Sequence, residues 1–148
     1  MATARISVND IRRFLLDKPG LNTLIDGVKW SDEDIDKACI DVIDAYNIIP
    51  PPIGHVNSIE SFPHRYLLLI GASGHLLRGA AIGEAVNQLT YSAEGVQVSD
   101  RDKAQLFTEL GNGFWKEFLD TARQIKISQN VNALLGTIGS EYGWVSSY

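Results

Sequence analysis

Three histidines, His55, His64 and His75, are the residues best suited to acid–base or metal chemistry. Two ligands on one face of a helix lie at i and i+4, and no two of these histidines have that spacing. His75 falls inside an apolar stretch, where a histidine is more often a hydrogen-bonded core or interface residue than a general base. The histidines therefore give no reason to expect a metal site or a catalytic base.

The other reactive side chains also have simpler structural roles. The single cysteine, Cys39, lies between Ala38 and Ile40 in a helical pattern and is expected to be a small buried hydrophobe. The glycine-rich run IGASGHLLRG lacks the preceding strand and the Gly-Lys-Ser/Thr of a phosphate loop. The carboxylates at positions 32, 33, 34 and 36 suit the start of a helix. We expect no enzyme and no cofactor.

Composition indicates one compact domain. The chain has 148 residues, 45% of them hydrophobic, which is enough for a core. Its net charge of -5 argues against general affinity for nucleic-acid phosphates. The opening MATARISVNDIRR lacks the apolar core of a signal peptide, and His75 and Arg78 interrupt the most apolar stretch. We therefore expect a soluble protein, made in a reducing cytoplasm and not bound to membranes.

The elements that position these residues are predicted to be helices, organised around the stretch from Ser61 to Leu89. This stretch opens with Ser-x-Pro, holds no proline after Pro63 and has apolar residues on most sides, which predicts one long central helix. Glycine destabilises a helix interior by up to about 1 kcal/mol relative to alanine. Four glycines in this helix therefore predict close approach of other backbones at Gly71, Gly74, Gly79 and Gly83.

Two shorter helices are predicted before it. Ser7 with Asp10 and Ser31 with Asp34 resemble capping boxes, in which the two side chains satisfy the first free N–H groups of a helix. They predict helices over residues 8–16 and 32–47. The prolines at 50–52 predict a stiff extended crossover to the central helix.

After the central helix, apolar and polar residues alternate around a glycine-containing turn, which predicts a β-hairpin at 89–98. A last helix is predicted from a cap at Ser99 to about Lys126. Beyond it, glycines alternate with apolar and aromatic residues, which is too apolar for an ordinary disordered end. The expected fold is mainly α: a small helical bundle around the long central helix (1–126), with a short β-hairpin and an extended C-terminal arm (127–148).

A family resemblance is carried by the run NQLTYSAEGVQVSDRDKAQLFTELGNGFWKEFLDTARQIKISQN and the closing SEYG, together with the opening VNDIRRFLLDKPGLNTLIDGVKWSDEDIDKACIDVIDAYN. These stretches resemble head-to-tail connector (adaptor or neck) proteins of tailed bacteriophages. The resemblance implies a homo-oligomeric ring, typically of twelve subunits, beneath the portal protein in the virion neck. Such a ring extends the channel for double-stranded DNA, which passes without specific binding, and offers a platform to the next neck or tail protein.

The resemblance also implies two contact regions. One is a portal-binding arm with apolar anchors at Ile138, Tyr142, Trp144, Val145 and Tyr148. The other is a ring-interface hairpin with Tyr91, Glu94, Val96 and Val98. Two alternatives stay open: a tail-completion or baseplate structural protein, and a small helical regulatory protein or enzyme.

Overall fold

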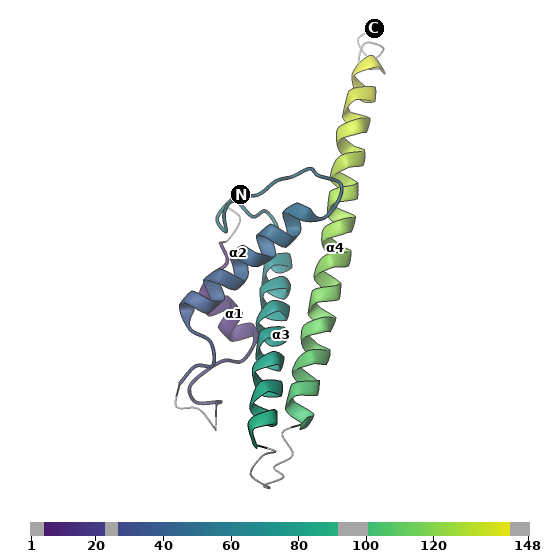
Figure 1. The fold of residues 1–148 in the computed structure, drawn as a ribbon. Helices are drawn as coiled ribbons and strands as arrows, with labels where there is room; N and C mark the ends of the chain where they lie inside the picture. Colours follow the sequence, from purple (N-terminus) through teal and green to yellow (C-terminus); the bar gives the residue numbers. More distant parts are fainter. Residues whose placement is uncertain (1–4, 23–26, 92–100, 143–148) are drawn as a thin grey trace.

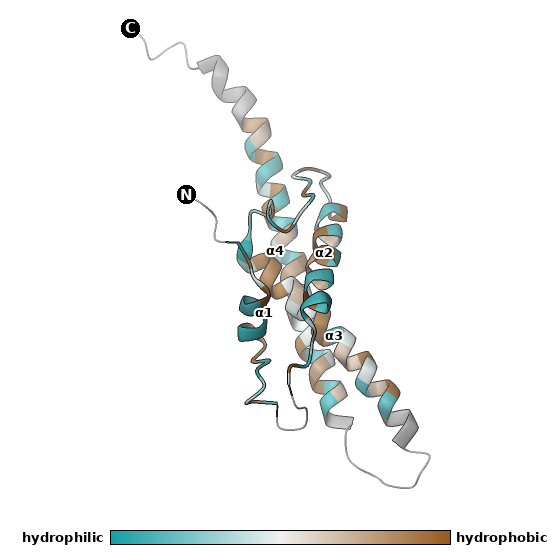
Figure 2. Cartoon of the chain, turned by 90° about the vertical axis from the view of Figure 1, so that its left-hand side faces the viewer, coloured by the Kyte–Doolittle hydropathy of each residue, from teal (hydrophilic) through white to brown (hydrophobic). Residues whose placement is uncertain are grey.

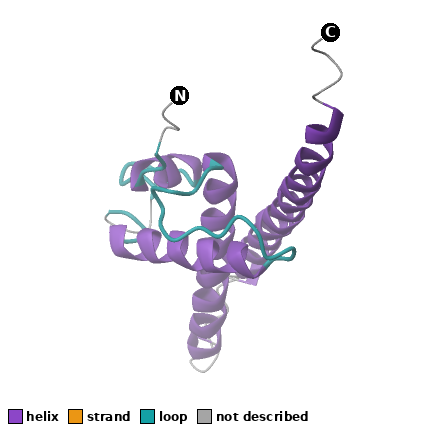
Figure 3. Cartoon of the chain, turned by 90° about the horizontal axis from the view of Figure 1, so that it is seen from above, coloured by secondary structure: helices purple, strands orange, loops and turns teal. Residues whose placement is uncertain are grey.

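The computed structural model describes residues 5–22, 27–91 and 101–142 of the chain. Within these ranges the chain forms four α-helices and no strand (Figures 1 and 3). Their bounds are α1 Val8–Phe14, α2 Asp32–Ile48, α3 Arg65–Tyr91 and α4 Arg101–Tyr142. The mainly helical class predicted from the sequence is confirmed.

The first two helices begin where their capping residues predict. The Ser7 hydroxyl accepts a hydrogen bond from the Asp10 N–H, and the Asp10 carboxylate accepts one from the Ser7 N–H. Ser31 and Asp34 make the same reciprocal pair at the start of α2. Each capping box satisfies two backbone donors at a helix start. The third predicted cap, at Ser99, lies outside the described residues.

Helices α3 and α4 run antiparallel, and α3 also contacts α1 and α2 (Figure 1). The buried face of α2 packs onto α3, so that the core is a single cluster shared by the four helices. Its largest fully buried apolar side chains are Tyr46, Phe118, Ile11, Ile35 and Leu68. The elements are therefore held together mainly by the apolar surface that α2 and α4 bury against α3.

One of the four glycines predicted to allow close approach of another backbone does so: a Cβ added at Gly74 would lie 3.0 Å from the Trp115 backbone nitrogen. Gly71 is also closely packed, but against side chains, since a Cβ there would lie 2.6 Å from Val42 Cγ1. On α4, Gly111 faces Gly74: a Cβ at Gly74 would lie 3.1 Å from the Gly111 carbonyl oxygen. The two long helices therefore touch backbone to backbone at this crossing.

The same prediction is wrong for the other two glycines. A Cβ at Gly79 or Gly83 would meet nothing within 4 Å. These residues lie in the part of α3 where Ile82 and Val86 are also exposed. This end of α3 is therefore less covered than the sequence pattern indicated.

Two predicted boundaries are corrected. The hairpin at 89–98 is not confirmed: residues 89–91 form the last turn of α3, because the helical pattern continues through them, and residues 92–98 lie outside the described part of the chain. The arm predicted to be extended from residue 127 is helical through Tyr142. Its glycines do not end the helix, because a glycine lowers helix stability without removing a backbone hydrogen bond.

Among the described residues, one helical stretch, Arg65–Asn87 in α3, is long and apolar enough to span a membrane by length and composition. His75 and Arg78 were expected to make this stretch too polar to span a membrane, but they do not lower its hydropathy that far. In the structure, 61% of the most apolar window is buried inside the molecule. The core helix of a water-soluble protein has the same properties, so this stretch is weak evidence for a membrane span.

Candidate functional site

Helix α4 is longer than the bundle and projects beyond it (Figures 1 and 2). Phe118, Ala122 and Lys126 are its last fully buried residues. At a rise of about 1.5 Å per residue, the helical residues after Lys126 extend for roughly 24 Å. We call residues 127–142 the projecting helix. It is the most prominent surface feature of the described chain.

The described part of the projecting helix exposes an apolar stripe. Ile127, Val131 and Leu134 are spaced by four and then three residues, which places them on one face of a helix, with Leu135 beside them. Their exposed fractions are 50%, 44%, 61% and 56%, respectively. No Asp, Glu, Lys or Arg occurs between residues 127 and 140. We call these four side chains the arm stripe.

A buried lysine marks the place where the helix leaves the bundle. Lys126 is fully buried, and its Nζ donates a hydrogen bond of 2.8 Å to the carbonyl oxygen of Ile49 at the end of α2. The same Nζ lies 4.6 Å from the centre of the Tyr46 ring. Burial lowers the pKa of Lys126 and raises that of Tyr46, because it disfavours the charged form of each. Lys126 thus ties α4 to the end of α2.

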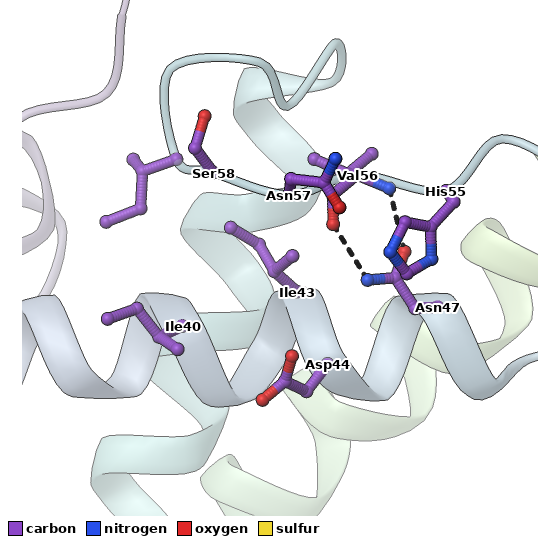
Figure 4. A pocket seen from close by; sticks show the side chains of 9 residues that line it. Ile40, Ile43, Asp44, Asn47, His55, Val56, Asn57 and Ser58 are labelled. Carbon is purple, nitrogen blue, oxygen red and sulfur yellow. Dashed lines mark hydrogen bonds between the residues drawn. The ribbon is translucent and has the colours of Figure 1, made fainter.

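The loop after α2 passes close to α4 at the next turn. Gly54 has a φ of +65°, and a Cβ there would lie 2.8 Å from Gln129 Oε1 on α4. This loop is held by Asn47, whose side chain accepts a hydrogen bond of 2.9 Å from the Val56 N–H and donates one of 2.8 Å to the Val56 carbonyl (Figure 4). The base of the projecting helix is therefore fixed by the residues of α2 and its loop.

A hollow of about 170 Å³ lies beside that loop, lined by residues of α2 and of the loop that include Ile40, Asp44 and His55 (Figure 4). Its Asn47 amide already makes two hydrogen bonds to Val56. The polar groups of this hollow can therefore be explained by the anchoring of the loop.

The three histidines are distributed over different parts of the molecule. His55 lines the hollow beside the loop, and the His64 ring lies edge-on to Phe62. His75 Nε2 lies 3.1 Å from Asp41 Oδ2, which joins α3 to α2. No group of three or more metal-ligating side chains occurs among the described residues.

Cys39 is buried, as the helical pattern around it predicts, and it forms no disulfide. Burial raises the pKa of its thiol to about 12, and the nearby Asp36 charge adds to the rise. Because the thiolate is the nucleophilic form, Cys39 is unreactive at neutral pH.

The structure places only some of the predicted contact residues. Ile138 and Tyr142 lie in the last turns of α4, and Tyr91 ends α3. The other predicted contact residues, Trp144, Val145, Tyr148, Glu94, Val96 and Val98, lie outside the described part of the chain. The arm stripe was not predicted, although its four-then-three spacing and lack of charge were visible in the sequence.

No family model, curated protein or solved structure matches the chain. Its function is therefore inferred from its own residues, its geometry and the resemblance described above.

Proposed function

We propose that the chain is a structural adaptor of the bacteriophage neck that forms a ring between the portal and the next neck or tail protein and extends the DNA channel. The observation that carries this proposal is the projecting helix. A helix that leaves its own bundle with exposed apolar residues is suited to contact another protein.

The position of the predicted portal-binding residues supports this role. Ile138 and Tyr142 belong to the last turns of α4, and the apolar and aromatic residues that follow lie further along the chain. Aromatic anchors supply much of the binding energy in protein interfaces. A helix with a fixed base can present such anchors at a defined distance from the ring.

Closed rings need a different contact patch on each side of the subunit. The chain has exposed apolar side chains at both ends of the α3–α4 pair: Ile82 and Val86 on α3, and the arm stripe on α4. These separate patches are compatible with heterologous contacts between neighbouring copies.

Charge supports a role in which DNA passes without being held. Helix α2 exposes Asp36, Asp41 and Asp44, and the whole chain carries a net charge of -5. A ring of acidic subunits would repel the phosphate backbone and let the genome slide. The proposed location is the virion neck, after synthesis in the host cytoplasm.

The proposal is tested by mixing the purified chain with the portal oligomer encoded in the same phage genome and measuring co-sedimentation. We expect a ring-sized complex with the full chain and weaker binding by a chain that ends at Thr137, because the truncation removes the predicted portal anchors. A full chain that stays monomeric and unbound in the presence of portal would overturn the proposal.

The same assay separates the tail-completion or baseplate alternative. A connector binds portal in preference to tail-tube or baseplate protein, whereas the alternative predicts the reverse preference. Competition between the two purified partners for a limiting amount of the chain would distinguish them.

A further inference from the structure

Two buried polar atoms lack a hydrogen-bond partner among the described residues at the place where the projecting helix leaves the bundle. They are the hydroxyl oxygen of Tyr46 on α2 and the amide oxygen Oε1 of Gln129 on α4. Tyr46 is fully buried, so bulk water does not reach its hydroxyl group. Buried polar groups in folded proteins are almost always hydrogen-bonded, either to protein or to an ordered water. Both atoms therefore require a partner that the side chains around them do not supply.

The two oxygens border the same small space. A Cβ added at Gly54 would lie 2.8 Å from Gln129 Oε1 and 3.9 Å from the Tyr46 hydroxyl oxygen. Both oxygens thus face the side of Gly54 on which a side chain would stand, and glycine leaves that side open. We call the space between Tyr46, Gln129 and Gly54 the junction site.

The tyrosine ring at the junction site is held in place by its neighbours. Phe62 packs edge-on against Tyr46, with 5.1 Å between the ring centres, and Lys126 Nζ lies 4.6 Å from the centre of the Tyr46 ring. Lys126 is itself held by its hydrogen bond to the Ile49 carbonyl oxygen. The Tyr46 hydroxyl therefore cannot swing toward Gln129 without breaking these contacts. The lysine ammonium carries three N–H donors, so donors remain for a further hydrogen bond.

We propose that the junction site binds one ordered water molecule that links α2 to α4. The water accepts a hydrogen bond from the Tyr46 hydroxyl, donates one to Gln129 Oε1 and accepts another from Lys126. A buried water typically makes two to four such bonds. A neutral ligand suits the site better than an anion, because Gln129 Oε1 and the Ile49 carbonyl oxygen are acceptors that would repel negative charge.

The bridge gives the base of the projecting helix a second polar link to α2, beside the bond between Lys126 and Ile49. It lies inside one copy of the chain and does not depend on the proposed function. Its loss would loosen the base of the projecting helix and leave the apolar core of the bundle intact.

A crystal structure of the full chain, at a resolution that shows ordered waters and with a bromide soak, tests the site directly. We expect one oxygen peak at about 2.7–3.0 Å from both Tyr46 Oη and Gln129 Oε1, without anomalous signal. A direct hydrogen bond between Tyr46 and Gln129 would overturn the proposal. A bromide peak at the junction site would also overturn it, in favour of an anion.

A double-mutant cycle tests the same link in solution. Tyr46→Phe or Gln129→Leu alone leaves the other oxygen with a poorer partner, whereas the double variant removes both oxygens. We expect each single variant to raise the unfolding equilibrium constant in urea. The double variant should raise it by about threefold or more less than the product of the single effects.

Tyr66→Phe is the matched control, because Tyr66 is 61% exposed on α3. Combined with Gln129→Leu, it should give effects that multiply. Circular dichroism checks that every variant is folded before urea is added. Effects that also multiply for Tyr46→Phe and Gln129→Leu would overturn the link between these two residues.

Discussion

At the scale of single residues, Asp17 is the group on which the loop between α1 and α2 depends. Its buried carboxylate accepts hydrogen bonds from the Lys29 N–H at 2.7 Å, from the Asn22 amide at 2.9 Å and from Arg12 at 2.9 Å. Burial by itself would raise the pKa of Asp17, but these hydrogen bonds, another from the Trp30 N–H and the Arg12 charge outweigh it. The pKa is therefore below its ordinary value of 3.8.

Replacing Asp17 with Asn should destabilise the fold by about 3 kcal/mol at neutral pH, because Arg12 and two backbone N–H groups lose a charged acceptor. Urea unfolding measures the change. A group with a lowered folded pKa stabilises the protein above its unfolded pKa, and this contribution is lost as the pH falls through the folded pKa. The difference between wild type and Asp17→Asn should therefore shrink below about pH 3.8.

Asp44→Asn is the matched control for Asp17→Asn, since Asp44 is exposed on α2. It should change the free energy of unfolding by no more than about 0.5 kcal/mol. Equal effects of the two substitutions would contradict the role given to Asp17.

Lys126 gives a pH dependence of the same sign as Asp17, but in the alkaline range, because its pKa is also lowered in the folded protein. Because burial lowers its folded pKa below the ordinary value of 10.5, the unfolded chain binds more protons in the window between the two values, and stability rises with pH there. In Lys126→Met this contribution is absent. The free energy of unfolding of the wild type should therefore rise relative to that of Lys126→Met as the pH increases from neutral toward 10.5. A constant difference across this range would show that Lys126 is not desolvated.

At the scale of elements, the contact between α3 and α4 depends on glycine at one crossing and not along the whole helix. Gly74 faces the backbone of Trp115 and Gly111, whereas Gly79 faces open space. Both are glycines in the same helix, and the sequence does not distinguish them. Only the position of α4 decides which one carries a packing requirement.

Gly74→Ala should destabilise the protein by about 1–3 kcal/mol, because the added methyl group would press on backbone atoms that cannot move independently of α4. Gly79→Ala should instead stabilise it by up to about 1 kcal/mol, through higher helix propensity at an open position. Thermal unfolding measures whether each variant is less or more stable than the wild type. Stabilisation by Gly74→Ala would contradict the close crossing.

At the scale of the whole molecule, the bundle and the projecting helix have different roles. The core residues on α4 end at Lys126, and residues 127–135 are exposed or only partly buried. The bundle should therefore fold without the end of the projecting helix, whereas assembly should depend on it.

A chain that ends at Thr137 should keep a thermal midpoint within a few degrees of the full chain, because it retains every core residue described above. A chain that ends at Thr121 also loses Ala122 and Lys126 and should unfold at a clearly lower temperature. Differential scanning calorimetry compares the two. If the chain that ends at Thr137 were unfolded, the end of α4 would belong to the core.

The sequence by itself determined the helical class, the starts of α1 and α2, and the burial of Cys39. These features depend on local hydrogen bonding and on apolar spacing within one helix, which neighbouring residues encode directly. The length of α4 was underestimated because Gly136 and Gly139 weaken a helical pattern without breaking the helix. Residues 89–91 were assigned to a strand because a short alternating pattern also fits the end of a helix.

Only the tertiary structure decided which glycines lie at a helix crossing, that Lys126 is buried against Ile49 and Tyr46, and that the arm stripe lies beyond the bundle. The physical reason is the same in each case. Burial depends on which distant element covers a residue, and Ile127 and Val131 lie past the last fully buried residue of α4. Helical spacing shows that these two residues share a face, but only the packed molecule shows that they stay about half exposed.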